Sequence, residues 1–353
     1  MWCFLVKINT GATYFAALNT GQGFISFFRE IFDSIETVYV IKGGSGTGKS
    51  RFMREVAEAA RGKGHAVEEF LCSSDPTSLD GIVINGLGVA VLDGTAPHIH
   101  EPTLIGAREH FVDLSAFLDG KYLKSKRYEI SALCASKNRR YQQIYEYLGI
   151  IYALDRSIKR LALNAFESEK LEKAVARSLL YTTKSVKYEK RVRIRSAVSS
   201  EGHIVLNSYA RKAKKRFAIS DLCGLGSMYM KSLLDKSDKL GASVEVSYSP
   251  YDPESPDAIF YPDTSVAFYL GSEGDYDEEI INMRRFVDDD RLRPFKPEIR
   301  SVNRLKNSVI ERMNFDFCSA KRLHNSLEEI YSSAMDFDRK ESFTKAFINE
   351  IIG

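Results

Sequence analysis

The run from Gly43 to Ser50 restricts the fold of this chain more than any other feature of its sequence. It reads GGSGTGKS and satisfies the pattern G-x-x-x-x-G-K-[ST] at every position. Residues 37–42 before it are β-branched and aromatic, which is typical of a buried strand, and residues 51–60 after it carry apolar side chains at helical spacing. Because strand, loop and helix follow in the required order, we interpret the run as a phosphate loop and not as a glycine-rich turn followed by a lysine.

The residue types in this run match the chemistry of a nucleotide polyphosphate. Glycines permit positive φ angles and a close approach of backbone to ligand, so the loop amides are predicted to point at phosphate oxygens. Lys49 is expected to neutralise phosphate charge, and the Ser50 hydroxyl is expected to ligate Mg²⁺. The predicted nucleotide-binding residues are Gly43, Gly44, Ser45, Gly46, Thr47, Gly48, Lys49 and Ser50.

Asp93 is the predicted second Mg²⁺ ligand. It ends the apolar run 89–93, which is typical of a strand buried on both faces, and the carboxyl edge of such strands is where open α/β sheets bind ligands. The alternative is that Asp93 and Gly94 only form a turn. Gly94 stands where many P-loop ATPases place a catalytic glutamate, so the sequence shows no dedicated water-activating base. The chain has no N-K-x-D motif for reading guanine, which makes ATP the default nucleotide.

His98 is a candidate catalytic residue near the γ-phosphate, as a sensor or proton acceptor, because an imidazole of pKa about 6.5 permits either role. A surface histidine is the alternative. Zinc bound by His98 and His100 is disfavoured because the ligand count is too low. Asp75, followed by Pro76, is interpreted as the N-cap of a helix, whereas the role of Asp80 stays open.

The chain contains two copies of one sequence unit. Residues 38–50 align with 216–228 at an offset of 178, and residues 66–82 align with 243–259 at an offset of 177. Seven of the seventeen positions in the second pair are identical, which indicates duplication of a whole domain and not a short-period solenoid.

The second copy lacks the residues that would hold a nucleotide. Lys49 aligns with Ser227, Ser50 with Met228 and Asp93 with Leu270, while Gly43 and Gly44 align with Asp221 and Leu222. A loop that binds phosphate needs amides and positive charge, so the second copy is predicted to fold without binding nucleotide.

These observations predict an α/β protein with two tandem P-loop NTPase-like domains, each a mainly parallel sheet flanked by helices. A chain of 353 residues has room for two such domains. The expected boundaries are 1–196 for the nucleotide-binding domain and 197–353 for the degenerate repeat with its C-terminal helices. A helical insertion is expected at about 137–182, and residues 157–165 echo 326–334, so each domain is expected to carry its own helical hairpin.

The sequence resembles a family of bacterial tandem P-loop ATP-binding proteins, which are mostly uncharacterised. The resemblance covers essentially the whole chain and rests on NTGQGF at 19–24, IKGGSGTGKS at 41–50, CSSD at 72–75, SLDG at 78–81 and DGTAPH at 93–98. It implies nucleotide binding and no particular substrate. In that family the second domain usually keeps a complete phosphate loop, and this chain departs from the pattern there.

Charge and composition limit the range of partners. Fifty basic and forty-seven acidic residues leave a net charge of +3, which indicates neither a nucleic-acid nor a membrane partner. Basic runs at 184–195 and 211–216 leave a nucleic-acid partner as an alternative, but a solvated protein face is the preferred interpretation. One arginine of these runs could also reach a γ-phosphate across the join between the two domains. No signal peptide or apolar span is recognised, and five scattered cysteines suit a reducing compartment, so a cytoplasmic location is expected.

Three functions fit this reading. The first is a slow ATPase whose nucleotide state controls a contact between the two halves or with a partner. The second is a kinase that passes the γ-phosphoryl group to a small acceptor, and the third is a nucleotide-gated interaction protein without significant turnover. The expected cofactors are ATP and Mg²⁺, and a protein or small-molecule partner stays unidentified.

Overall fold

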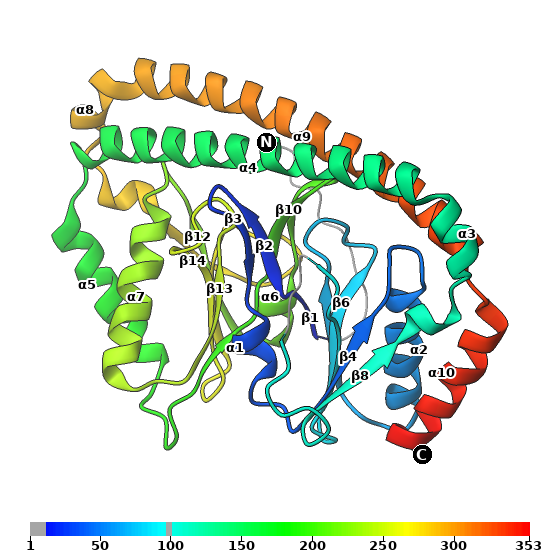
Figure 1. Cartoon of the computed structure of the whole chain (residues 1–353). Helices are drawn as coiled ribbons and strands as arrows, with labels where there is room; N and C mark the ends of the chain where they lie inside the picture. The colour runs from blue at the N-terminus through cyan, green and yellow to red at the C-terminus, as the bar shows by residue number, and fades with distance from the viewer. Residues whose placement is uncertain (1–11, 97–100) are drawn as a thin grey trace.

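Two six-stranded mixed sheets stand side by side with helices on their outer faces, and two long helices run across both of them (Figure 1). The computed structural model describes residues 12–96 and 101–353. Within these ranges no helix is long and apolar enough to cross a membrane.

The first sheet has the strand order β1-β5-β6-β7-β4-β8. The β5–β6 and β6–β7 pairs are antiparallel and the other pairs are parallel. Five of the six strands therefore run in one direction, as expected of a mainly parallel sheet, and only β6 is reversed. Strand β6 is antiparallel because it follows β5 after a turn too short for a crossover. The strands are β1 Ala12–Phe15, β4 Thr37–Lys42, β5 Val67–Leu71, β6 Leu79–Ile84, β7 Val89–Asp93 and β8 Glu109–Asp113.

The second sheet repeats the first in both order and direction. Its order is β9-β13-β14-β15-β12-β16, and each pair of strands is parallel or antiparallel as its counterpart is. A register shift interrupts β5–β6 at Phe70/Leu71 and β13–β14 at Ser247/Tyr248, so even the irregularity is repeated. The duplication inferred from sequence is thus present in the fold. The strands are β9 Lys190–Val192, β12 Lys215–Ser220, β13 Val244–Tyr248, β14 Pro256–Tyr261, β15 Val266–Leu270 and β16 Glu279–Asn282.

Two hairpins join the halves at the centre of the molecule. The amide of Phe15 donates to the carbonyl of Ile194 at 2.7 Å, immediately before the hairpins begin. The first hairpin is β2 Ala17–Thr20 with β3 Gly23–Ser26, and the second is β10 Ser196–Ser199 with β11 Gly202–Val205. Each is followed by a short helix, α1 Phe28–Phe32 or α6 Ser208–Lys212.

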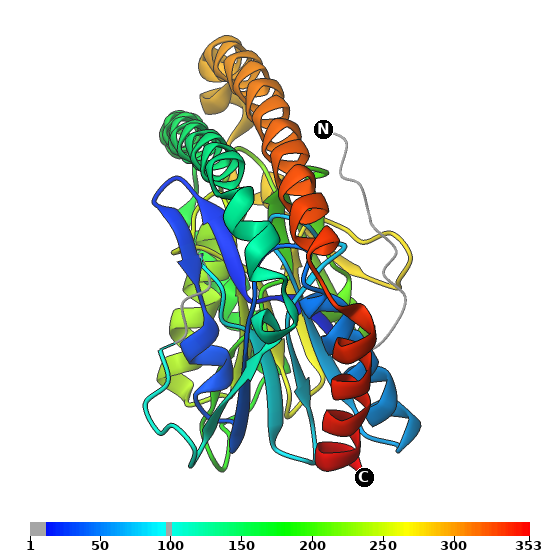
Figure 2. The same ribbon diagram turned by 45° about the vertical axis from the view of Figure 1, so that its right-hand side comes forward.

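The long helices α4 (Arg127–Leu163) and α9 (Lys296–Ser333) lie side by side in both views (Figures 1 and 2). Arg140 pairs with Asp316 at 2.8 Å and Lys306 with Asp155 at 2.6 Å, so the later residue of one helix meets the earlier residue of the other and the helices are antiparallel. Smaller elements flank them: α3 Gly120–Ser125, α8 Asp289–Leu292, and the 3₁₀ turns η1 Leu114–Phe117, η2 Leu179–Tyr181, η3 Met283–Phe286 and η4 Arg293–Phe295.

Each long helix carries its chain to the opposite half. Helix α5 (Ser168–Ser178), which follows the first sheet in sequence, packs on α7 (Gly226–Leu240) of the second half. Helix α10 (Phe337–Ile352) returns to α2 (Lys49–Gly62) of the first half, where the Phe52 ring lies 5.0 Å from that of Phe347. The expectation that each half keeps its own helical hairpin is therefore corrected to an exchange between halves.

The basic run at 184–195 is solvated over most of its length, as expected, but its last residues are structural. Lys184, Lys187, Lys190 and Arg191 are exposed. Arg193 and Arg195 are only 6% and 3% exposed. Arg193 donates to Glu68 of the first half at 2.8 Å, and Arg195 donates to Glu273 of the acidic stretch at 2.8 Å. Both guanidinium groups are committed to holding the central region together.

Candidate functional site

The glycine-rich loop links β4 to α2 at the end of the first sheet that faces α9. Gly46 and Gly48 have φ angles of +72° and +79°, which lie in the left-handed region, and Gly48 directly precedes α2. Glycine takes this conformation without steric cost, so the chain can reverse and begin the helix at once. The Thr47 hydroxyl donates to the Gly44 carbonyl at 2.9 Å and braces the turn.

The structure brings Lys49 and Asp93 together. The Lys49 ammonium lies 3.6 Å from Asp93 Oδ2, and the two side chains are 12% and 14% exposed. The contact arises because β7 lies next to β4 with Ile41 paired to Asp93, so Asp93 ends beside the loop. Lys49 also donates to the carbonyls of Gly43 and Gly44, at 3.1 and 2.8 Å. Thus Lys49 and Asp93, which the sequence analysis expected at one site, do lie together.

Ser50 and Asp93 are the oxygen donors that suit a hard divalent cation. The Ser50 hydroxyl, on the first turn of α2, accepts a hydrogen bond from the Leu79 amide at 3.0 Å. Asp93 Oδ1 accepts from the Thr95 amide at 2.8 Å, which leaves Oδ2 turned toward Lys49. In the described ranges no three or more His, Cys, Asp or Glu side chains are grouped as a metal site. A cation here would therefore depend on phosphate oxygens for further ligands.

Helix α9 of the second half lies directly on the loop. A Cβ atom added to Gly46 would lie 2.5 Å from the Glu328 carbonyl oxygen, and one added to Gly44 would lie 2.6 Å from the Tyr331 ring. These glycines occupy x positions of the motif. Their lack of a side chain is therefore required for packing against α9, whatever the ligand.

Three lysines from other elements surround the loop. Lys340 of α10 is 3% exposed, and its ammonium lies 3.4 Å from the place where Gly48 would carry a Cβ. Lys321 of α9 donates to Asp75 at 3.0 Å, and Lys137 of α4 lies in the electrostatic field of Lys49 and Glu328. Burial lowers the pKa of both Lys137 and Lys340, which shows that their charge is poorly solvated. An anion bound at the loop would offset that cost.

Asp75 forms a tight turn and not the predicted helix cap. The amide of Ser78 donates to its carbonyl at 2.9 Å, and Thr77 donates to its carboxylate through its hydroxyl at 2.7 Å. Burial raises the pKa of Asp75, but hydrogen bonds from Thr77 and Lys321 outweigh burial and leave it below its usual value. Asp80 is buried in β6. His98 and His100 lie outside the described residues.

The loop of the second half holds a carboxylate of its own. Asp221 Oδ2 accepts from the Gly224 amide at 2.9 Å, and Oδ1 accepts from the Gly226 amide at 2.6 Å. Lys159, which arrives on α4 from the first half, donates to the Ser227 hydroxyl at 2.7 Å. An internal carboxylate and a lysine from the opposite half thus occupy a loop whose counterpart is predicted to hold phosphate and its own lysine.

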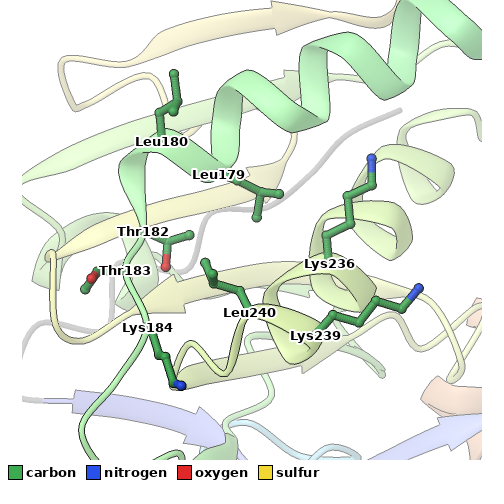
Figure 3. A pocket seen from close by; sticks show the side chains of 8 residues that line it. All are labelled: Leu179, Leu180, Thr182, Thr183, Lys184, Lys236, Lys239 and Leu240. Atoms are coloured by element: carbon green, nitrogen blue, oxygen red, sulfur yellow. The ribbon is translucent and has the colours of Figure 1, made fainter.

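A separate surface hollow of about 700 Å³ lies between η2 and α7 on the second half (Figure 3). It is open to solvent and lined by Leu179, Leu180, Thr182, Thr183, Lys184, Lys236, Lys239 and Leu240. None of these side chains belongs to the glycine-rich loop, so the hollow is not part of this site.

The sequence offered no signal for the residues that α9 and α10 bring to the loop. Lys321, Glu328, Tyr331 and Lys340 lie almost 300 residues beyond it in the chain. The echo between 157–165 and 326–334 aligns Lys159 with Glu328, and only the structure shows that both face a loop. Comparisons of the chain with family models, with curated proteins and with solved structures found no match.

Proposed function

We propose that the first half binds Mg²⁺-ATP at the loop 43–50 and hydrolyses it slowly. The observation that carries the proposal is the contact of Lys49 and Asp93 at the end of β7, beside a loop with two left-handed glycines. That combination supplies amides, a cation and a carboxylate where a nucleotide triphosphate needs them. On the same residues we propose membership of the tandem P-loop proteins that the sequence resembles.

Each residue has a chemical role in this proposal. Lys49 would turn from the carbonyls of Gly43 and Gly44 to the β- and γ-phosphates, because a full negative charge attracts it more strongly than a carbonyl dipole. Ser50 and Asp93 would hold Mg²⁺, which neutralises charge that develops on the phosphoryl group. Lys340 and Lys137 would stabilise the anion from the side of the covering helices.

Nucleotide state would control the contact between the halves. The backbone of α9 touches Gly46, so a phosphate group beside the loop would alter the position of α9. Since α9 begins over the second half and ends over the first, any displacement would be transmitted along a rigid rod.

Titration of Mg²⁺-ATP into the parent protein and Lys49→Ala tests this proposal. Lys49→Ala should weaken binding at least tenfold, because it removes a partly buried charge from the phosphates. The matched control is Lys63→Ala, an exposed lysine just after α2, which should leave binding unchanged. Undiminished binding by Lys49→Ala would refute the site.

Turnover assays separate the competing activities. Release of phosphate without an added acceptor supports the ATPase. ADP formation that depends on added nucleosides or nucleotides would instead support the kinase, and tight binding without either would support a nucleotide-gated interaction protein.

A further inference from the structure

We propose that Glu328, carried by α9 of the second half, is the carboxylate that activates water at the nucleotide site of the first half. The inference rests on the proposed function and identifies the residue that the loop's own half does not supply. It is argued from the packing of α9 and from the carboxylates that surround the loop.

The first half cannot place a glutamate directly after Asp93. A Cβ atom added to Gly94 would overlap Val40 Cγ1 of the neighbouring strand, and the Gly94 carbonyl accepts from Lys42 at 2.7 Å. A side chain at this position would clash with the Val40 side chain and crowd Lys42, so glycine is favoured here by packing. The missing base must therefore come from another element.

The other carboxylates beside the loop are already committed. Asp93 faces Lys49, and Asp75 accepts from both Thr77 and Lys321. Asp80 is only 3% exposed within β6, where bulk water does not reach it. None of the three combines a carboxylate that is not paired with a lysine and ready access to solvent, because Asp93 and Asp75 are paired with lysines and their side chains are only 14% and 21% exposed.

Glu328 meets both conditions. Its backbone lies against Gly46, its side chain is 45% exposed, and Oε1 lies 3.5 Å from Nε2 of His324, one turn earlier in α9. The hydrogen bond from His324 lowers the pKa of Glu328, so the carboxylate is ionised at neutral pH. Besides His324, the charged groups that face Glu328 are Lys49 of α2, Asp75 of the turn between β5 and β6, and Lys137 of α4.

In the second half, the residue aligned with Glu328 has the opposite charge, and so does the loop beneath it. Lys159 occupies the corresponding place on α4, with its Cβ 3.8 Å from a Cβ built on Gly224. It lies over a loop that holds Asp221, whereas Glu328 lies over a loop that holds Lys49. At this one aligned position the covering helix thus carries the sign opposite to that of the loop residue beneath it, and only the lysine-bearing loop receives a carboxylate there.

The chemical step balances without any further reactant. A water oxygen attacks the γ-phosphorus, its proton passes to a Glu328 oxygen, and the bond from phosphorus to the β–γ bridging oxygen breaks. ADP and inorganic phosphate form, and Glu328 returns the proton to solvent. General-base assistance of this kind contributes roughly 10²–10⁴-fold to the rate.

The test is single-turnover hydrolysis of γ-labelled ATP by the parent, Glu328→Gln and Glu329→Gln. Glu328→Gln preserves size and should lower the hydrolysis rate by about 100-fold or more while binding of Mg²⁺-ATP changes less than threefold. Glu329 is exposed on the same helix, so Glu329→Gln should match the parent.

Retention of rate by Glu328→Gln overturns this inference and leaves the ATPase proposal intact. Parent protein that binds Mg²⁺-ATP and never hydrolyses it overturns both this inference and the proposed hydrolysis, and leaves only the binding site. Failure of the parent to bind would instead refute the proposed function. Unchanged circular dichroism and retained ATP binding exclude misfolding of Glu328→Gln. A purely structural role for Glu328 would lower stability and leave the rate of the folded protein unchanged.

Discussion

Replacing Gly46 by alanine should reveal how much the cover formed by α9 depends on a missing side chain. The residue has φ of +72°, where an alanine costs about 1–2 kcal/mol. The added Cβ would also lie 2.5 Å from the Glu328 carbonyl oxygen, so α9 would have to move by about 1 Å to restore an ordinary contact. Overpacking of this kind costs about 1–3 kcal/mol, which brings the expected loss to about 2–5 kcal/mol.

The duplicated loop offers a matched control. Gly224 has φ of +79°, but a Cβ there would lie 3.8 Å from Lys159, which is an ordinary contact. Gly224→Ala should therefore cost only the backbone contribution of about 1–2 kcal/mol. The difference between the two variants measures the contact of α9 with the first loop.

Equilibrium urea unfolding supplies the stabilities, and hydrogen exchange shows where the change lies. Gly46→Ala should lower the unfolding midpoint more than Gly224→Ala and should speed amide exchange in residues 324–333 of α9. Equal losses in the two variants, with exchange in α9 unchanged, would refute the idea that α9 packs on the loop through the missing Cβ.

Three further outcomes are expected. Asp221→Ala should lower the free energy of unfolding by about 2–5 kcal/mol, because it leaves two loop amides without their charged acceptor. Asp221→Asn should lower it less, and equal urea midpoints for the parent and Asp221→Ala would contradict the prediction. Burial lowers the pKa of His203 to about 4 from 6.5, so its contribution of up to about 3 kcal/mol to the free energy of unfolding is present above pH 6.5 and is lost as pH falls toward 4. His203→Asn should make the free energy of unfolding, measured with urea, depend less on pH between 6.5 and 4. An unchanged pH dependence in this range would contradict the prediction. Lys340→Met should raise thermal stability without ligand and weaken Mg²⁺-ATP binding at least threefold by calorimetry, whereas unchanged affinity would remove Lys340 from the site.

Local patterns were enough to predict the parts of the site that are close in sequence. The run 37–42 is β4, the helix after the loop is α2, and the run ending at Asp93 is β7. Side-chain periodicity and glycine placement act over a few residues, so these elements can be read directly. The two sheets also share one strand order, which confirms the duplication. The sequence was sufficient here too, because similar local sequence patterns form the same strands and helices.

Predictions that depended on distant partners were less accurate. The run at 184–195 has the composition of a solvated face, yet Arg193 and Arg195 are buried against Glu68 and Glu273. Asp75 and Pro76 resemble a helix start, but the chain turns straight into β6. Local preference is weak compared with the packing that a neighbouring element imposes.

The sequence by itself determined the loop, its lysine, its carboxylate partner and the existence of a second copy without them. The tertiary structure decided that α9 and α10 cross to the first half, that Glu328 and Lys340 reach its loop, and that Asp221 fills the amides of the second. The physical reason is range. Backbone and periodicity preferences are set by neighbouring residues, whereas contacts between residues almost 300 positions apart depend on how two whole domains bury their surfaces together.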